Sequence, residues 1–162
     1  MSQKQKKWAS AHFRNRRPQP AHIQKPCGNS STVSALGERV DAAVNACLQE
    51  AGAPWREVAG GEWGITTEAG GWPLHAGLAR RGGLLPAQAE VFAAGAAPAA
   101  ALLHRNRRLE LVRLASTTAG TIWVTGEIPL LAATEPREVD RLLGSLLRAA
   151  DEVRCAYRRP TL

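Results

Sequence analysis

The fold of this chain is decided by residues 102–130, which read LLHRNRRLELVRLASTTAGTIWVTGEIPL. Alanine and leucine between 97 and 107 predict a short helix, and the apolar run 109–116 predicts a strand. A turn at 117–120 leads into a second strand, 120–129, in which apolar and polar residues alternate. The stretch therefore predicts a helix joined to a β-hairpin.

The second strand of this hairpin has two chemically different faces. Its apolar face holds Ile122, Val124, Gly126 and Ile128, and its other face holds Thr121, Trp123, Thr125 and Glu127. If the apolar face meets helices, Trp123 lies on the opposite face of the sheet. An exposed Trp on a small, polar surface is typical of interface anchors. We therefore predict that Trp123, with Thr121 and Thr125, contacts a second protein surface.

Helices and strands are also predicted on both sides of this stretch. Ser34 is a plausible N-cap for a helix that continues at 3.6-residue spacing to Gly52. Paired glycines at 60–61, 70–71 and 82–83 divide the next segment into pieces typical of an antiparallel meander. The strands expected there are 62–68, 72–80 and 84–93.

A last helix is predicted after the hairpin, with Thr134 as its cap and Pro136 in its first turn. Its apolar stripe runs from Val139 to Val153, with Arg and Asp/Glu opposite. The expected order is α-β-β-β-α-β-β-α. This order predicts an α+β domain, an antiparallel sheet of about five strands with helices packed on one face.

The motif HRNRR, residues 104–108, admits three interpretations. A kinase catalytic loop needs an acid where Asn106 stands, and the other kinase motifs are missing. A nucleic-acid patch would use its arginines, yet Glu110 is close and the acidic helices offset the charge. The motif best fits a structural junction, in which Leu102 and Leu103 dock the short helix, Asn106 takes the left-handed cap conformation and Leu109 begins the strand.

The net charge of +7 is concentrated at the N-terminus. Residues 1–37 contain no acid, and their basic residues are Lys4, Lys6, Lys7, Arg14, Arg16, Arg17 and Lys25. The rest of the chain balances fourteen arginines against fourteen acids. We expect residues 1–33 to form a disordered basic arm and residues 34–162 to form the folded domain. Apart from Lys25, these basic residues surround Trp8, and together they could bind nucleic acid weakly through phosphate neutralisation.

Catalytic and metal-binding patterns are not found in the sequence. No pair of Cys or His has zinc-ligand spacing, and Cys47 and Cys155 fall on apolar helix positions typical of inert thiols. No Ser, Cys, His and acid form a recognisable set, so no enzyme, metal or cofactor is expected. No apolar run is long enough to span a membrane, and no signal peptide is evident, so the expected location is the cytoplasm.

The stretch quoted above, followed by EVDRLLGSLLRAADEV, resembles YbjN-type bacterial proteins, which share a fold with class I type III secretion chaperones. The shared features are a short helix ending at Asn106, an apolar strand, a hairpin whose second strand ends in Glu127–Pro129, and a closing helix. The resemblance spans residues 34–158 and carries over no catalytic residue.

It implies a non-enzymatic, dimeric, chaperone-like adaptor that binds a protein client, in a bacterial stress response. The alternative is a nucleic-acid-associated regulator, related to DNA damage or single-stranded DNA, that acts through its basic arm. Nucleic acid or a DNA-binding protein would then be a partner. No membrane partner is expected.

Overall fold

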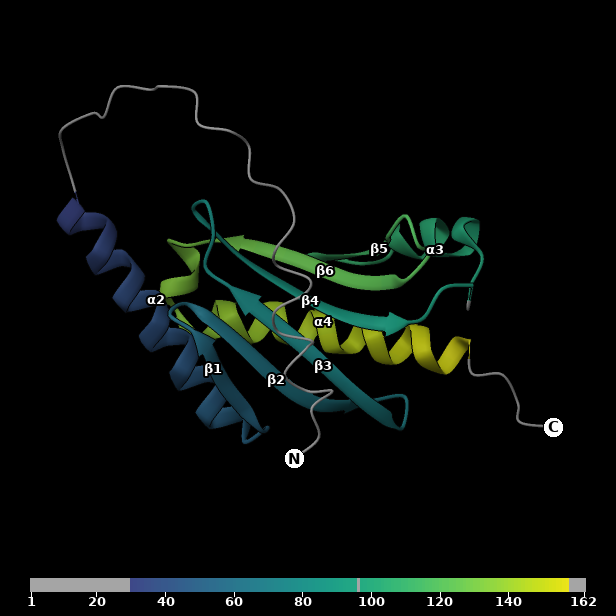
Figure 1. Cartoon of the computed structure of the whole chain (residues 1–162), viewed down its shortest axis with the longest axis horizontal. Coiled ribbons are helices and arrows are strands. Elements are labelled where there is room, and N and C mark those ends of the chain that lie inside the picture. Colours follow the sequence, from purple (N-terminus) through teal and green to yellow (C-terminus); the bar gives the residue numbers. More distant parts are fainter. Residues whose placement is uncertain (1–29, 96, 158–162) are drawn as a thin grey trace, which may run out of the picture.

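The computed structural model describes residues 30–95 and 97–157 (Figure 1). The helices are α2 (Ser30–Ala51), α3 (Ala99–Asn106), the short 3-10 helix η1 (Ala132–Thr134) and α4 (Pro136–Ala156). The strands are β1 (Trp55–Ala59), β2 (Glu62–Ala69), β3 (Trp72–Ala79), β4 (Leu84–Phe92), β5 (Val112–Ser116) and β6 (Ile122–Pro129). No helix in these two ranges has the length and apolar character needed to cross a lipid bilayer.

The strands form one antiparallel sheet with the order β1-β2-β3-β4-β6-β5. Helix α4 crosses one face of this sheet, where it packs on β4 and β6, and α2 packs against α4 and η1 (Figure 1). Helix α3 lies beside β5 at the sheet edge. The predicted α+β class with an antiparallel sheet is confirmed, and the sheet has six strands rather than five.

The additional strand is β1, at the opposite edge of the sheet from β5. Its sequence, WREVA, lacks the apolar alternation that marks a half-buried strand, and all of its residues after Trp55 are exposed. Its register with β2 shifts between Glu57 and Ala59. A short, charged and irregular strand is a common way to protect a sheet edge from unwanted pairing. The same features give the strand no apolar alternation by which it could be predicted.

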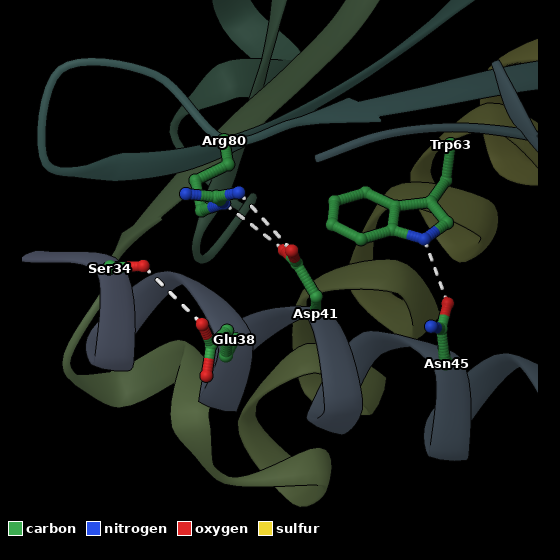
Figure 2. A network of polar contacts seen from close by, with 6 residues as sticks. All are labelled: Ser34, Glu38, Asp41, Asn45, Trp63 and Arg80. Carbon is green, nitrogen blue, oxygen red and sulfur yellow. Dashed lines mark hydrogen bonds and ion pairs between the residues drawn. The ribbon is translucent and has the colours of Figure 1, made fainter. Parts of the chain in front are cut away.

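Helix α2 begins four residues before Ser34, which lies inside the helix and donates a hydrogen bond to Glu38. Farther along, Asp41 forms an ion pair with Arg80 at 3.1 Å, and Asn45 accepts a hydrogen bond from Trp63 Nε1 at 2.9 Å. Figure 2 shows the Asp41–Arg80 and Asn45–Trp63 contacts lying between the helix and the sheet. The spacing of four residues keeps them on one helix face, so α2 is fixed against the sheet by polar contacts as well as by its apolar stripe.

The closing helix α4 follows the expected apolar stripe, because Val139, Leu142, Leu146, Ala150 and Val153 are all buried. Its N-cap is Glu135 and not Thr134, which belongs to η1 and donates its hydroxyl to the carbonyl of Leu131. The 3-10 turn therefore delays the start of the helix, while Pro136 occupies the first turn as predicted.

The conformation predicted for Asn106 is wrong, although Asn106 does end α3. The one non-glycine residue with positive φ in the described ranges is Leu111, at 61°. The Val112 amide donates to the carbonyl of Glu110 at 2.7 Å, so Leu111 is the centre of a tight three-residue turn that enters β5. Asn106 instead uses its side chain, donating to the Leu114 carbonyl at 3.0 Å and accepting from the Leu114 amide at 2.7 Å.

This two-point contact supplies hydrogen-bond partners for the Leu114 amide and carbonyl on the open edge of β5. Without Asn106, these backbone groups could pair with another strand. We expect Asn106→Gly and Asn106→Ala to lower the free energy of unfolding by about 2 kcal/mol, because both groups of Leu114 lose their partner. Urea denaturation measures this change. Arg107→Ala, at the exposed neighbouring position, is the control and should stay within about 0.5 kcal/mol of the parent. A tolerated Asn106→Gly would restore the left-handed cap interpretation.

Candidate protein-binding site at the end of α4

A cavity of about 400 Å³ lies between α3 and the last turns of α4. We call it the α3–α4 pocket. Its lining residues are Ala101, His104, Arg105, Arg108, Leu109, Glu152, Val153 and Tyr157. Three of them, His104, Arg105 and Arg108, belong to the HRNRR motif and Leu109 follows it, so the junction between helix and strand also forms a concave surface. The sequence predicted a junction between helix and strand here but gave no sign of this pocket, because α4 contributes its other wall.

The pocket wall is held in place by aromatic and cationic contacts. The Arg105 guanidinium lies over the ring of Tyr157, 5.6 Å from its centroid. That ring also meets Phe92 of β4 edge-on, with centroids 6.3 Å apart. Contacts of both kinds are attractive through the ring quadrupole, so they fix the end of α4 relative to α3 and the sheet.

Arg154 joins the same end of α4 to two separate strands. Its guanidinium donates to the carbonyls of Ala69, Trp72 and Pro73 on the β2–β3 side and of Glu90 and Val91 on β4, at 3.1–3.3 Å. Pairing between β3 and β4 covers only Ala76–Leu78 and their partners. The guanidinium therefore fills the gap where these strands separate. Burial lowers the pKa of Arg154, and the Glu90 carboxylate opposes this change.

Trp72 lies at the start of β3, beside this Arg154 contact. Its side chain is 58% exposed, although tryptophan is costly to leave in water. Its backbone is fixed, because its carbonyl accepts from Arg154 at 3.1 Å and the nearby Gly70 amide donates to Asp151 at 2.6 Å. Both partners belong to α4. Trp72 and the α3–α4 pocket thus lie at the same end of the domain.

The prediction of an exposed Trp123 is wrong. The residue does face away from Val124 and the core, but it is only 7% exposed. Strand β6 lies inside the sheet, so Trp123 has cross-strand neighbours on both sides, Glu90 and Ala115. Thr121 and Thr125 are half-buried. Alternation identified the face of the sheet correctly, but it did not reveal how much of the ring the surroundings cover.

The predicted helix–strand junction differs in part from the structure, and the predicted nucleic-acid site lies outside the described residues. Leu103 does not dock α3, since it is 69% exposed, whereas Leu102 is buried and Leu109 packs partly against the core. Leu109 precedes β5, which starts at Val112. The nucleic-acid residues predicted in the arm lie outside the described ranges; they are Lys4, Lys6, Lys7, Trp8, Arg14, Arg16 and Arg17.

The described residues hold no group of three His, Cys, Asp or Glu side chains placed to bind a metal ion. Cys47 is buried in α2, and burial, aided by Asp140 and Glu50, raises the pKa of its thiol to about 11. Cys155 is exposed, contrary to its predicted apolar position, and its sulfur lies 4.0 Å from Asp151. This end of the domain instead presents arginine and aromatic side chains, residue types that are enriched at protein interfaces.

Comparisons with known proteins found no matching family model and no matching curated protein. Among solved structures, the chain is similar to the type III secretion chaperone SycH from Yersinia pestis, in complex with a stable fragment of YscM2. That similarity has a TM-score of 0.49 and 14% identity, over 68% of this chain and 96% of the other. The ExoT–SpcS complex from Pseudomonas aeruginosa gives a TM-score of 0.49 and 16% identity, over 72% and 96%. Neither similarity carries a conclusion about function.

Proposed function

We propose that this protein is a non-enzymatic, chaperone-like adaptor that binds segments of a protein partner. The observation that carries the proposal is the exposed Trp72 on a backbone fixed by Arg154 and Asp151. A rigid, exposed aromatic side chain supplies binding energy without a large cost in conformational entropy. The role that the sequence suggested for Trp123 is therefore proposed for Trp72.

The direct test uses a permanently unfolded probe, reduced and carboxymethylated α-lactalbumin, labelled for fluorescence anisotropy. We expect the full chain to bind it and Trp72→Ala to weaken binding roughly tenfold or more, as for a hot-spot tryptophan. Trp55→Phe, at a half-buried position that keeps an aromatic ring, is the matched control. Equal binding by Trp72→Ala and the parent would contradict the proposal, as would no binding by the parent.

We also propose that the adaptor is a homodimer and acts in a bacterial stress response, which is what the resemblance to YbjN-type proteins and secretion chaperones implies. A C2 dimer would present two copies of Trp72 and the α3–α4 pocket to one client. Light scattering on the full chain at micromolar concentration decides the oligomeric state, and a monodisperse monomer would contradict the dimer.

A second candidate is association with nucleic acid through the basic arm. The observation that favours it is that the net charge of +7 belongs to residues 1–37. Binding of single-stranded DNA should then fall steeply with salt and disappear when residues 1–29 are removed, a boundary that leaves α2 whole. If the shortened chain bound single-stranded DNA as tightly as the full chain, the arm would not be the binding site.

A further inference from the structure

The arginines at the α3–α4 pocket are among those that form no ion pair in the described ranges. Arg80, Arg81, Arg113 and Arg141 each form an ion pair with a carboxylate. In residues 30–95 and 97–157, no such pair involves Arg105, Arg107 or Arg108. Two of these three side chains, Arg105 and Arg108, line the pocket. The pocket therefore offers two guanidinium groups that form no direct ion pair with an acid in the described ranges.

The positions of these groups follow from helical spacing. Ala101, His104, Arg105 and Arg108 follow the spacing i, i+3, i+4 and i+7, so they project from the same side of α3 and its end. Arg105 is held over the Tyr157 ring, and Arg108 is exposed. The small side chain of Ala101 leaves space between these cations and α4.

The rest of the pocket lining is largely apolar. Leu109, Val153 and the ring of Tyr157 contribute carbon surface, and the one acid that lines the pocket is Glu152. A volume of about 400 Å³ admits one or two side chains, at the small end of the range for ligand pockets. An occupant that matches both walls carries an apolar group next to a carboxylate.

We propose that the α3–α4 pocket binds an acidic segment of a protein partner, with an apolar side chain inserted and its flanking carboxylates paired with Arg105 and Arg108. This inference rests on the proposed adaptor function and adds the chemical class of the partner. Carboxylates match the planar guanidinium fork. Nucleic acid fits less well, because it needs an extended basic surface, whereas residues 38–162 have no net charge.

The test uses two fluorescein-labelled peptides of alternating sequence, one of leucine and glutamate and one of leucine and glutamine. We expect the full chain to bind the glutamate peptide and Arg108→Glu to weaken that binding roughly tenfold or more. Arg107→Glu is the matched control, since it makes the same charge change at an adjacent exposed residue that does not line the pocket. It should change affinity by no more than about twofold.

A third variant guards against effects on folding. Glu152→Gln removes the acid from the pocket and should tighten binding of the glutamate peptide by about two- to fivefold, a gain that unfolding cannot produce. Equal losses in Arg107→Glu and Arg108→Glu, equal binding of both peptides, or no gain in Glu152→Gln would each overturn the proposal. Tighter binding of a single-stranded oligonucleotide, lost in Arg108→Glu, would assign the pocket to nucleic acid instead. If the unfolded-protein probe binds through Trp72 while Arg108→Glu keeps its peptide affinity, the pocket inference fails and the adaptor function stands.

Discussion

Gly126→Ala is expected to lower the free energy of unfolding by about 3 kcal/mol, because β6 has no space for a methyl group at this position. A Cβ there would lie 2.6 Å from the Leu111 carbonyl oxygen, 2.7 Å from Val112 Cγ1 and 3.1 Å from Leu142 Cδ1. A side chain can move away, but the Leu111 carbonyl is fixed by the tight turn at the start of β5. The backbone itself would have to shift.

Gly144→Ala is the matched control for this substitution. Gly144 lies inside α4, and apart from its chain neighbours and the backbone of its own helix no heavy atom lies within 4 Å of the position its Cβ would take. Alanine there should raise stability by about 0.5–1 kcal/mol through its higher helix propensity. Urea denaturation of both variants gives opposite signs if the packing around Gly126 is as described. A neutral Gly126→Ala would show that β5 approaches β6 less closely than the structure indicates.

Gly126 also shows which parts of the fold were readable from the sequence. Alternation around it predicted β6, and the apolar stripe from Val139 to Val153 predicted α4, because both patterns depend on one buried face. The reason for a glycine at 126 was not readable, since it depends on Leu111, which takes a positive φ that leucine rarely adopts. Such a conformation is imposed by packing and leaves no sign in local propensity.

The candidate site was predicted less well than the fold, for a related reason. Trp72 and Trp123 both lie on strands, and only the residues packed around each ring decide which of the two is buried. In the same way, Arg105 and Arg108 become part of a pocket only when Glu152 in α4 and Tyr157 at its end close the other side. Sequence patterns show which face of a helix or strand is buried. A site formed by two elements that are distant in the sequence can be located only when their packing is known.

Arg154 is the residue whose role the sequence most understated, because it occupies a position next to Val153 that predicts an ordinary solvated side chain. Its five carbonyl contacts join α4 to the β2–β3 turn and to β4. We expect Arg154→Ala to lower the free energy of unfolding by about 3 kcal/mol, since hydrogen bonds from a charged group are lost and several carbonyls are left unpaired.

Arg154→Lys tests whether the stabilisation comes from the positive charge of Arg154 or from the shape of its guanidinium group. Lysine keeps the positive charge but is a point donor on a flexible stem, so it cannot reach carbonyls on both separated strands as the planar guanidinium does. We expect it to recover less than half of the loss in Arg154→Ala. Arg148→Ala is the control on the same helix, because its guanidinium contact in the described ranges is a 3.4 Å bond to Ser145, and it should change stability by less than about 0.5 kcal/mol.

The same variants connect stability to the proposed function. Because Arg154 bonds the Trp72 carbonyl, its loss should free the β2–β3 turn and raise the mobility of the indole, which time-resolved fluorescence anisotropy of a variant with Trp72 as the sole tryptophan can measure. Binding of the unfolded probe should then weaken in Arg154→Lys at a temperature where the chain is still folded, since an anchor that must be ordered on binding loses affinity. If Arg154→Lys destabilises the fold but leaves binding unchanged, the guanidinium is a structural tie between strands, and the rigidity of Trp72 is not what the partner requires.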